Sequence, residues 1–117
     1  MLVFSEYQTD TIDLALDFYG YEDCPKNYEF GPSVRDNFVL HFITKGKGVF
    51  HFNKKEIHLE AGDLFLLPKN KVTYYKADEE EPWSYYWIGI SGTKVSDFMR
   101  FSTLHEKGFL KKTEVET

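Results

Sequence analysis

A series of short strands separated by turn-forming residues is the feature that most limits the folds open to this 117-residue chain. The strand segments are rich in β-branched and aromatic residues, and Gly, Pro, Asn or Lys residues stand between them. They span residues 14–19, 38–44, 49–53, 57–59, 64–67, 72–75 and 83–90. About seven or eight short strands at such close spacing predict a mostly β chain, folded as an antiparallel barrel or a double-sheet jelly roll.

Two connections between these strands have a recognisable composition. The tetrapeptide Lys-Gly-Lys-Gly at 45–48 is predicted to be a hairpin turn between strands 38–44 and 49–53. The segment 20–37 contains two prolines, two glycines and two asparagines, and is predicted to be mostly loop. We find no internal repeat, and we therefore expect one domain.

The two ends of the chain depart from the strand pattern. Residues 1–12 show no clear period and are predicted to be an arm. A helix is predicted to begin at Thr93 and to end at Gly108. Its wide apolar face suggests a contact with another protein surface, such as a dimer interface, and contains Val95, Phe98, Met99 and Ser102. The chain is accordingly divided into an arm (1–12), a barrel (13–92) and a helix with the start of a linker (93–117).

Charge and cysteine content narrow the class of protein further. The formal net charge is −5, which makes this chain poorly suited to bind a phosphate backbone by itself. The single cysteine, Cys24, excludes an internal disulfide and a cysteine-rich zinc site. No apolar run approaches the roughly 18 residues of a membrane span, and the first residues lack the features of a signal peptide. We therefore expect a soluble cytoplasmic protein without a membrane partner.

The ordered motifs of the barrel segment carry a family resemblance. Gly62, Asp63 and Pro68 have the spacing of the second half of the cupin signature. The wider pattern consists of GPSVRDNFVLHFITKGKGVFHF, EIHLEAGDLFLLPKNKVTYYKAD and PWSYYWIGISG. Together these runs resemble the N-terminal effector-binding domain of AraC-family transcription regulators, in the branch that controls sugar-utilisation operons. The resemblance covers residues 18–92.

The resemblance implies a fold and a function. The fold is a cupin-like antiparallel jelly-roll barrel followed by a C-terminal helix. The function is to sense a small effector, a mono- or oligosaccharide, without catalysis, while DNA is bound only through a C-terminal helix-turn-helix domain that this chain lacks. We therefore expect this chain to be the sensor part of a longer homodimeric protein, with an N-terminal arm that folds over the ligand. A short stand-alone cupin and a frayed arm are the alternatives.

Histidine spacing bears on whether the barrel holds a metal. Catalytic cupins bind their metal through three histidines and a carboxylate, and two of those histidines have the spacing H-x-H. His51 is followed by Phe52 and Asn53, and Thr73 stands where the last ligand histidine is expected. We therefore predict no metal and no cofactor. A small metal-dependent cupin isomerase or dioxygenase is the alternative enzymatic interpretation.

The segment 83–90 supplies aromatic residues with polar groups. Trp83, Tyr85 and Trp87 alternate, so that in a strand all three face the same side. Sugars are recognised by an aromatic ring against the C–H face and by fixed hydrogen-bonding groups at the hydroxyls. The resemblance implies that Trp87 stacks on the sugar and that Tyr85 and Tyr75 also line its pocket. For Trp83, at the start of the strand, we favour a place in the core.

Two more residues complete the predicted ligand site. The resemblance implies an arginine just before the first long barrel strand, and Arg35 is the nearest match. A surface salt bridge between Arg35 and Asp36 or Glu29 is the alternative. His41 lies in an apolar strand, where a hydrogen-bonded core histidine is the common case, but its side chain can also point into the pocket. If all these aromatic residues only filled the barrel, the domain would be a structural dimerisation module.

Overall fold

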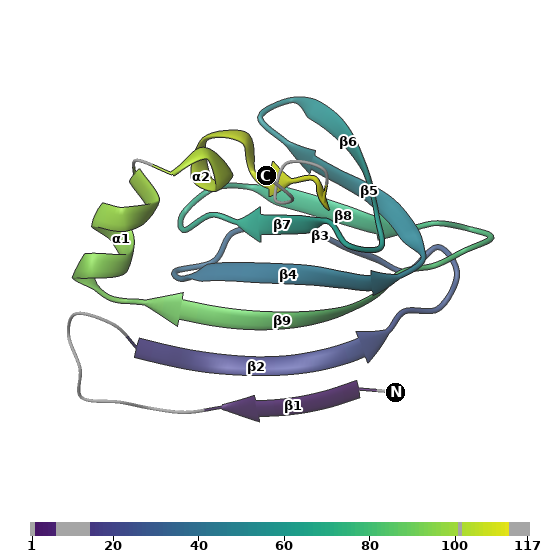
Figure 1. Ribbon diagram of the computed structural model, residues 1–117, viewed down its shortest axis with the longest axis horizontal. Helices are drawn as coiled ribbons and strands as arrows, with labels where there is room; N and C mark the ends of the chain where they lie inside the picture. Colours follow the sequence, from purple (N-terminus) through teal and green to yellow (C-terminus); the bar gives the residue numbers. More distant parts are fainter. Residues whose placement is uncertain (1, 7–14, 101, 113–117) are drawn as a thin grey trace.

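The computed structural model describes residues 2–6, 15–100 and 102–112, and these form two antiparallel sheets that pack face to face (Figure 1). The six-stranded sheet has the order β1 (Leu2–Glu6), β2 (Ala15–Asp23), β9 (Ser84–Ser91), β4 (Phe38–Lys45), β7 (Leu64–Leu67) and β10 (Phe109–Leu110). The four-stranded sheet has the order β3 (Glu29–Ser33), β8 (Thr73–Ala77), β5 (Lys47–Phe52) and β6 (Lys55–Glu60). The predicted jelly-roll class is confirmed.

The connections between strands explain how the chain alternates between the two sheets. Asn53 and Lys54 both have positive φ angles, of 54° and 63°, and form the two-residue turn that joins β5 to β6. The predicted hairpin at 45–48 is wrong, because β4 and β5 belong to different sheets. Gly46, with a φ of 75°, instead turns the chain from one sheet to the other. Local composition predicts a turn there, but it does not predict which strands the turn joins.

The predicted loop at 20–37 is also wrong for much of its length. Strand β2 continues to Asp23 because its whole second half pairs with β9, with Gly20 opposite Trp87. Strand β3 pairs with β8, and its Gly31-Pro32 bulge lies at the edge of the four-stranded sheet, where a proline is tolerated. Partners distant in sequence therefore override the turn-forming composition.

The C-terminal helix is broken into two. Helix α1 (Thr93–Arg100) begins where predicted, whereas α2 (Thr103–Lys107) is separate. Ser102 is the N-cap of α2 and its hydroxyl accepts a hydrogen bond of 3.0 Å from the backbone N–H of His105, so Ser102 does not belong to one continuous apolar face. Gly108, with a φ of 85°, ends α2 as predicted for the helix end.

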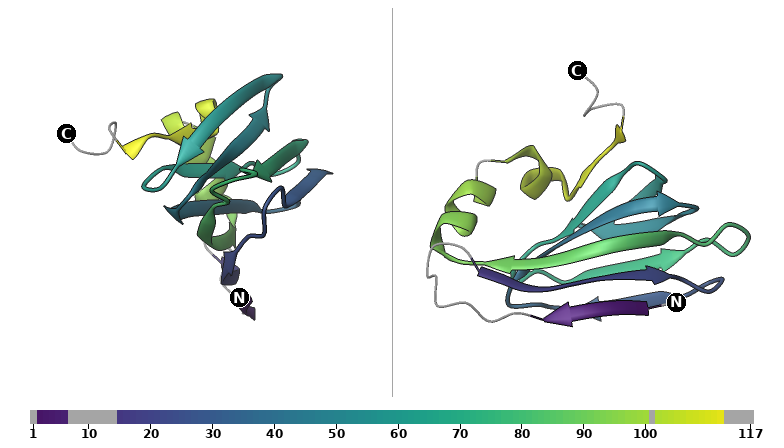
Figure 2. Two further views of the ribbon diagram at one scale, coloured as in Figure 1. Left: turned by 90° about the vertical axis from the view of Figure 1, so that its right-hand side faces the viewer. Right: turned by 60° about the horizontal axis from the view of Figure 1, so that its bottom comes forward.

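The N-terminal residues and the two helices flank the sandwich. Of the predicted arm at 1–12, residues 2–6 form β1 at the edge of the six-stranded sheet, and residues 7–12 lie outside the described residues. Figure 1 and the right view of Figure 2 place α1 and α2 at one end of the sandwich. There Val95 and Met99 pack on Phe38 and Leu66, so these apolar residues are covered by the domain itself. No helix within the described ranges is long and apolar enough to cross a membrane.

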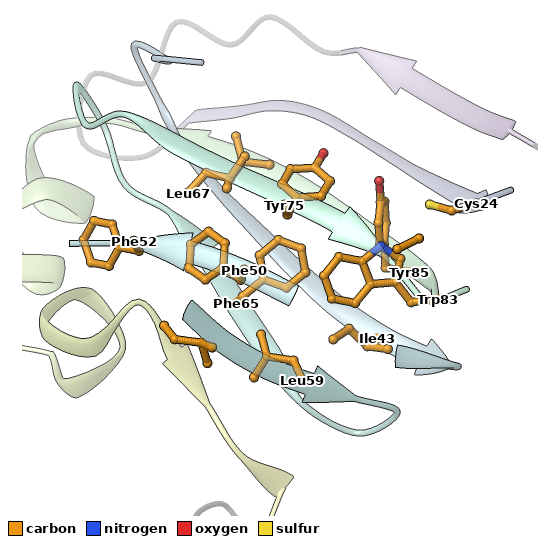
Figure 3. Packing of buried hydrophobic residues seen from close by; sticks show 13 residues of the cluster. Cys24, Ile43, Phe50, Phe52, Leu59, Phe65, Leu67, Tyr75, Trp83 and Tyr85 are labelled. Carbon is orange, nitrogen blue, oxygen red and sulfur yellow. The ribbon is translucent and has the colours of Figure 1, made fainter. Parts of the chain in front are cut away.

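Aromatic side chains fill the space between the sheets. Phe65 is fully buried and stands between Phe50, at a centroid distance of 5.0 Å, and Trp83, at 5.2 Å (Figure 3). Tyr75 and Tyr85 border the same cluster, and their hydroxyl groups lie on one side of it (Figure 3). The core therefore changes from purely apolar rings to rings with polar groups across the barrel.

Candidate functional site

A cavity of about 470 Å³ opens between the two sheets, beside the aromatic core. Its walls come from β2, β3, β4, β8 and β9 and from the segment before β4. The five residues predicted for the ligand site all line it. Among the described residues, the lining consists of Phe18, Glu22, Tyr28, Phe30, Arg35, Val39, His41, Tyr75, Tyr85 and Trp87. A cavity of this size falls in the range of small-molecule sites, roughly 300 to 1,000 Å³.

Strand β9 sends alternate side chains to opposite faces of its sheet, as predicted. Tyr85 and Trp87 face the cavity, with their ring centroids 5.9 Å apart at an angle of 72°. Tyr86 points to the outer face and is 57% exposed. Trp83 is fully buried in the core and does not line the cavity, which confirms the core position favoured for it.

His41 lies in the cavity wall and is almost completely buried. Its ring stacks on Phe65 at a centroid distance of 4.3 Å and meets Tyr85 edge-on at 4.8 Å. Burial, reinforced by the positive charge of Arg35, lowers the pKa of His41 to about 3, so the imidazole is neutral at neutral pH. Its Nδ1 atom has no hydrogen-bond partner among the described residues. His41 is therefore a buried histidine, but not the fully hydrogen-bonded one that is common in cores.

Arg35 closes one side of the cavity between the two sheets. Its guanidinium carbon lies 5.5 Å from the ring centroids of both Phe18, on β2, and Phe30, on β3. Within the described residues it forms no ion pair with Asp36 or Glu29, and Glu29 accepts a hydrogen bond of 2.6 Å from the Tyr74 hydroxyl instead. The Nε atom of Arg35 is buried and, in that same part of the chain, without a hydrogen-bond partner.

Tyrosine hydroxyl groups supply further polar groups at the cavity. Burial raises the pKa of Tyr75 and of Tyr85 well above the usual value. Burial and the negative charge of Glu22 likewise raise the pKa of Tyr28. All three phenols therefore stay protonated at neutral pH, and each can both donate and accept a hydrogen bond.

Five of the described lining residues were not predicted from the sequence: Phe18, Glu22, Tyr28, Phe30 and Val39. Three of them were hidden because the segment 20–37 reads as a loop. The alternation of Phe18, Gly20 and Glu22 is the signal that could have found Glu22, since it continues the strand predicted at 14–19. Glu22 pairs with Tyr85 in the sheet, and its Oε1 lies 3.4 Å from the Tyr85 hydroxyl.

The histidines and the cysteine are placed as follows. His51 and His58 are exposed, and Thr73 is buried in β8. Across the described ranges, no three His, Cys, Asp or Glu side chains converge in a way that could hold a metal ion. Cys24 is buried, and burial raises the pKa of its thiol to about 12, which leaves it a poor nucleophile.

Comparisons of the sequence agree with this geometry. Residues 15–117 match the family described as AraC-like ligand binding domain. The Msm operon regulatory protein of Streptococcus mutans is 46% identical over 105 residues, covering 90% of this chain and 38% of that protein. The raffinose operon transcriptional regulatory protein RafR of Pediococcus pentosaceus is 41% identical (83% and 36%), and the lactose operon transcription activator of Staphylococcus xylosus is 33% identical (84% and 35%). The chain thus spans a little over a third of the length of these relatives.

Solved structures share the fold at low sequence identity. The protein YhaK from Escherichia coli has a TM-score of 0.66 at 13% identity, and the match covers 80% of this chain and 46% of YhaK. The Cnp3 cupin domain of Schizosaccharomyces pombe has a TM-score of 0.62 at 16% identity, covering 85% and 70%. These likenesses establish a cupin-type jelly roll.

Proposed function

The chain belongs to the family of AraC-like ligand binding domains, and on that premise we propose that its cavity binds a small sugar as the effector of a transcription regulator. Two of its relatives are named for a raffinose operon and a lactose operon, which supports a mono- or oligosaccharide as the ligand. In this proposal the domain binds its ligand without changing it chemically. The regulator itself works in the cytoplasm.

The observation that carries this proposal is the mixed lining of the cavity, where aromatic rings stand beside the guanidinium of Arg35 and the carboxylate of Glu22. Trp87 provides an amphipathic ring for the C–H face of a sugar, and Tyr75 and Tyr85 add hydroxyl groups. Aromatic faces combined with fixed polar groups are the two elements of sugar recognition.

A route from the cavity to the C-terminal segment supports a regulatory role. His41 in the cavity wall stacks on Phe65, and Phe65 lies opposite Phe109 in the pairing of β7 with β10. The carbonyl of Gly108, at the end of α2, accepts a hydrogen bond of 2.8 Å from the backbone N–H of Leu66. A ligand in the cavity would therefore influence the position of Gly108 and Phe109 through these contacts.

The remaining parts of the proposal concern the whole protein. They comprise an N-terminal arm that closes over the ligand, a homodimer, and DNA binding through a C-terminal helix-turn-helix domain. The division of the chain at residues 12 and 92 belongs to the same proposal.

Titration calorimetry of the 117-residue chain with raffinose, lactose and their component monosaccharides tests the proposed function. At least one sugar is expected to bind, and Trp87→Ala is expected to weaken its binding at least tenfold, equivalent to about 1.4 kcal/mol. Tyr86→Ala is the matched control, since Tyr86 is the next residue along β9 but faces away from the cavity. No binding by any sugar, or equal weakening by the two substitutions, would contradict the proposal.

A further inference from the structure

We infer that Glu22 makes the cavity selective for neutral ligands. Its carboxylate lets the cavity accept electrically neutral sugars and disfavours sugars that carry a phosphate or a carboxylate. This inference rests on the proposed function and makes it more specific. It concerns a residue that sequence reasoning did not identify as part of the site.

Glu22 lies in the cavity wall with much of its hydrogen-bonding capacity unused. It comes from β2, beside Tyr85 of β9, and both residues line the cavity. Its Oε1 accepts a long hydrogen bond of 3.4 Å from the Tyr85 hydroxyl and lies 3.9 Å from the Cys24 thiol. A carboxylate has about four acceptor positions, so these two weak contacts leave room for hydroxyl groups of a ligand. In the part of the chain that the structure describes, no lysine, arginine or histidine forms an ion pair with Glu22.

The other ionisable groups at the cavity define its charge. Among the described lining residues Arg35 is the only cation, and His41 is neutral because burial lowers its pKa. The tyrosines from the remaining strands stay protonated, since burial raises their pKa. The described lining therefore carries one negative and one positive charge at neutral pH, from Glu22 and Arg35.

These opposite charges act differently on ligands of different charge. A neutral sugar can donate hydroxyl protons to Glu22 and accept from Arg35. An anionic sugar gains from Arg35 but meets the like charge of Glu22 within the same cavity. The guanidinium of Arg35 already has the faces of Phe18 and Phe30 as cation–π partners, whereas Glu22 has no cationic partner among the described residues. The uncompensated carboxylate is therefore the group that decides the selectivity.

The experiment compares neutral and anionic sugars on the wild-type chain and on Glu22→Gln. The neutral probes are galactose, lactose and raffinose, and the anionic probes are galactose 6-phosphate and galacturonate, titrated by calorimetry at pH 7 and fixed salt. Glu22→Gln keeps the side-chain shape and an acceptor for Tyr85, and it removes only the charge. Glu56→Gln is the matched control, because Glu56 is exposed on β6 and lies outside the cavity.

The expected result has two parts. First, the wild-type chain binds at least one neutral sugar at least tenfold more tightly than either anionic sugar. Second, Glu22→Gln lowers the ratio of the neutral-sugar affinity to the anionic-sugar affinity at least tenfold, while Glu56→Gln leaves this ratio unchanged. If an anionic sugar binds the wild-type chain as tightly as the neutral ones, the inference is overturned and the proposed function stands. The same holds if Glu22→Gln folds and leaves the ratio unchanged. If no sugar of either class binds, the proposed function fails and the inference fails with it. The wild-type comparison needs no substitution, so it holds even if Glu22→Gln does not fold.

Discussion

Acidification is expected to destabilise this domain through one residue, His41. The pKa of His41 is about 3 in the folded protein, against about 6.5 in the unfolded chain, so between these values the unfolded state binds more protons. Stability is therefore lost as the pH falls from about 6.5 toward 3. Applying proton linkage to these two values gives a loss of about 2 kcal/mol between pH 7 and pH 5 from this group alone.

Urea unfolding followed by tryptophan fluorescence at pH 7 and pH 5 measures this loss. His41→Phe is the test variant, since a phenyl ring can keep the stacking on Phe65 and the adjoining cavity gives the extra volume room. The variant is expected to lose about 2 kcal/mol less than the wild-type protein over this pH range. Hydrogen bonds lower the pKa values of Asp23 and Asp78, so the contributions of these residues to stability are lost mainly at lower pH. They cancel when the variant is compared with the wild-type protein.

His58→Gln is the control for the general effect of removing a histidine, because His58 is exposed on β6. It is expected to show the same pH dependence as the wild-type protein. The reasoning is refuted if His41→Phe and the wild-type protein lose equal free energy of unfolding between pH 7 and pH 5. An imidazole NMR titration of His41 with a midpoint near pH 6.5 would refute it directly.

Two further substitutions test the packing around the site. In Gly89→Ala the new Cβ would lie 2.6 Å from Cε1 of Phe18 and closer still to Cζ, so the ring, which also contacts the guanidinium of Arg35, must move. We expect a loss of about 1–3 kcal/mol in thermal unfolding and weaker ligand binding, and unchanged binding would show that the Phe18 position does not matter. The buried carboxylate of Asp63 accepts backbone hydrogen bonds of 2.9 Å from Glu60 and from Lys112, and Asp63→Asn removes its charge. We expect this substitution to lower the free energy of unfolding by about 1–3 kcal/mol and to make amide hydrogen exchange in residues 109–112 at least tenfold faster. Unchanged exchange would contradict the role of Asp63 in anchoring this segment.

The strands that were predictable are those whose signal is local. The alternation of Tyr85 and Trp87 places both on one face of β9, and the apolar segments at 38–44 and 64–67 become β4 and β7. The missed strand β3 contains Gly31-Pro32 and is held by its pairing with β8, whose paired residues are 40 to 47 positions away in sequence. The hairpin predicted at 45–48 is wrong for a related reason. The composition of the turn indicates that the chain changes direction, but not which sheet the next strand joins.

The candidate site divides in the same way. The alternation in β9 predicts that Tyr85 and Trp87 share a face. It does not predict that these two residues line the cavity while Trp83 is buried in the core. Of the polar residues at the cavity, Arg35, His41, Tyr75 and Tyr85 were predicted from the sequence. Glu22 was not, because it reaches the cavity through the pairing of β2 with β9, which the sequence does not show.

An NMR titration of the two tryptophan indole N–H signals with the neutral sugars tests directly whether this cavity binds the ligand. Trp87 lines the cavity, whereas Trp83 is fully buried in the core and does not line it, so the chain contains its own reference signal. We expect the Trp87 signal to shift saturably with at least one sugar and the Trp83 signal to shift much less. A sugar that binds the protein and leaves the Trp87 signal in place would contradict the assignment of this cavity as the ligand site.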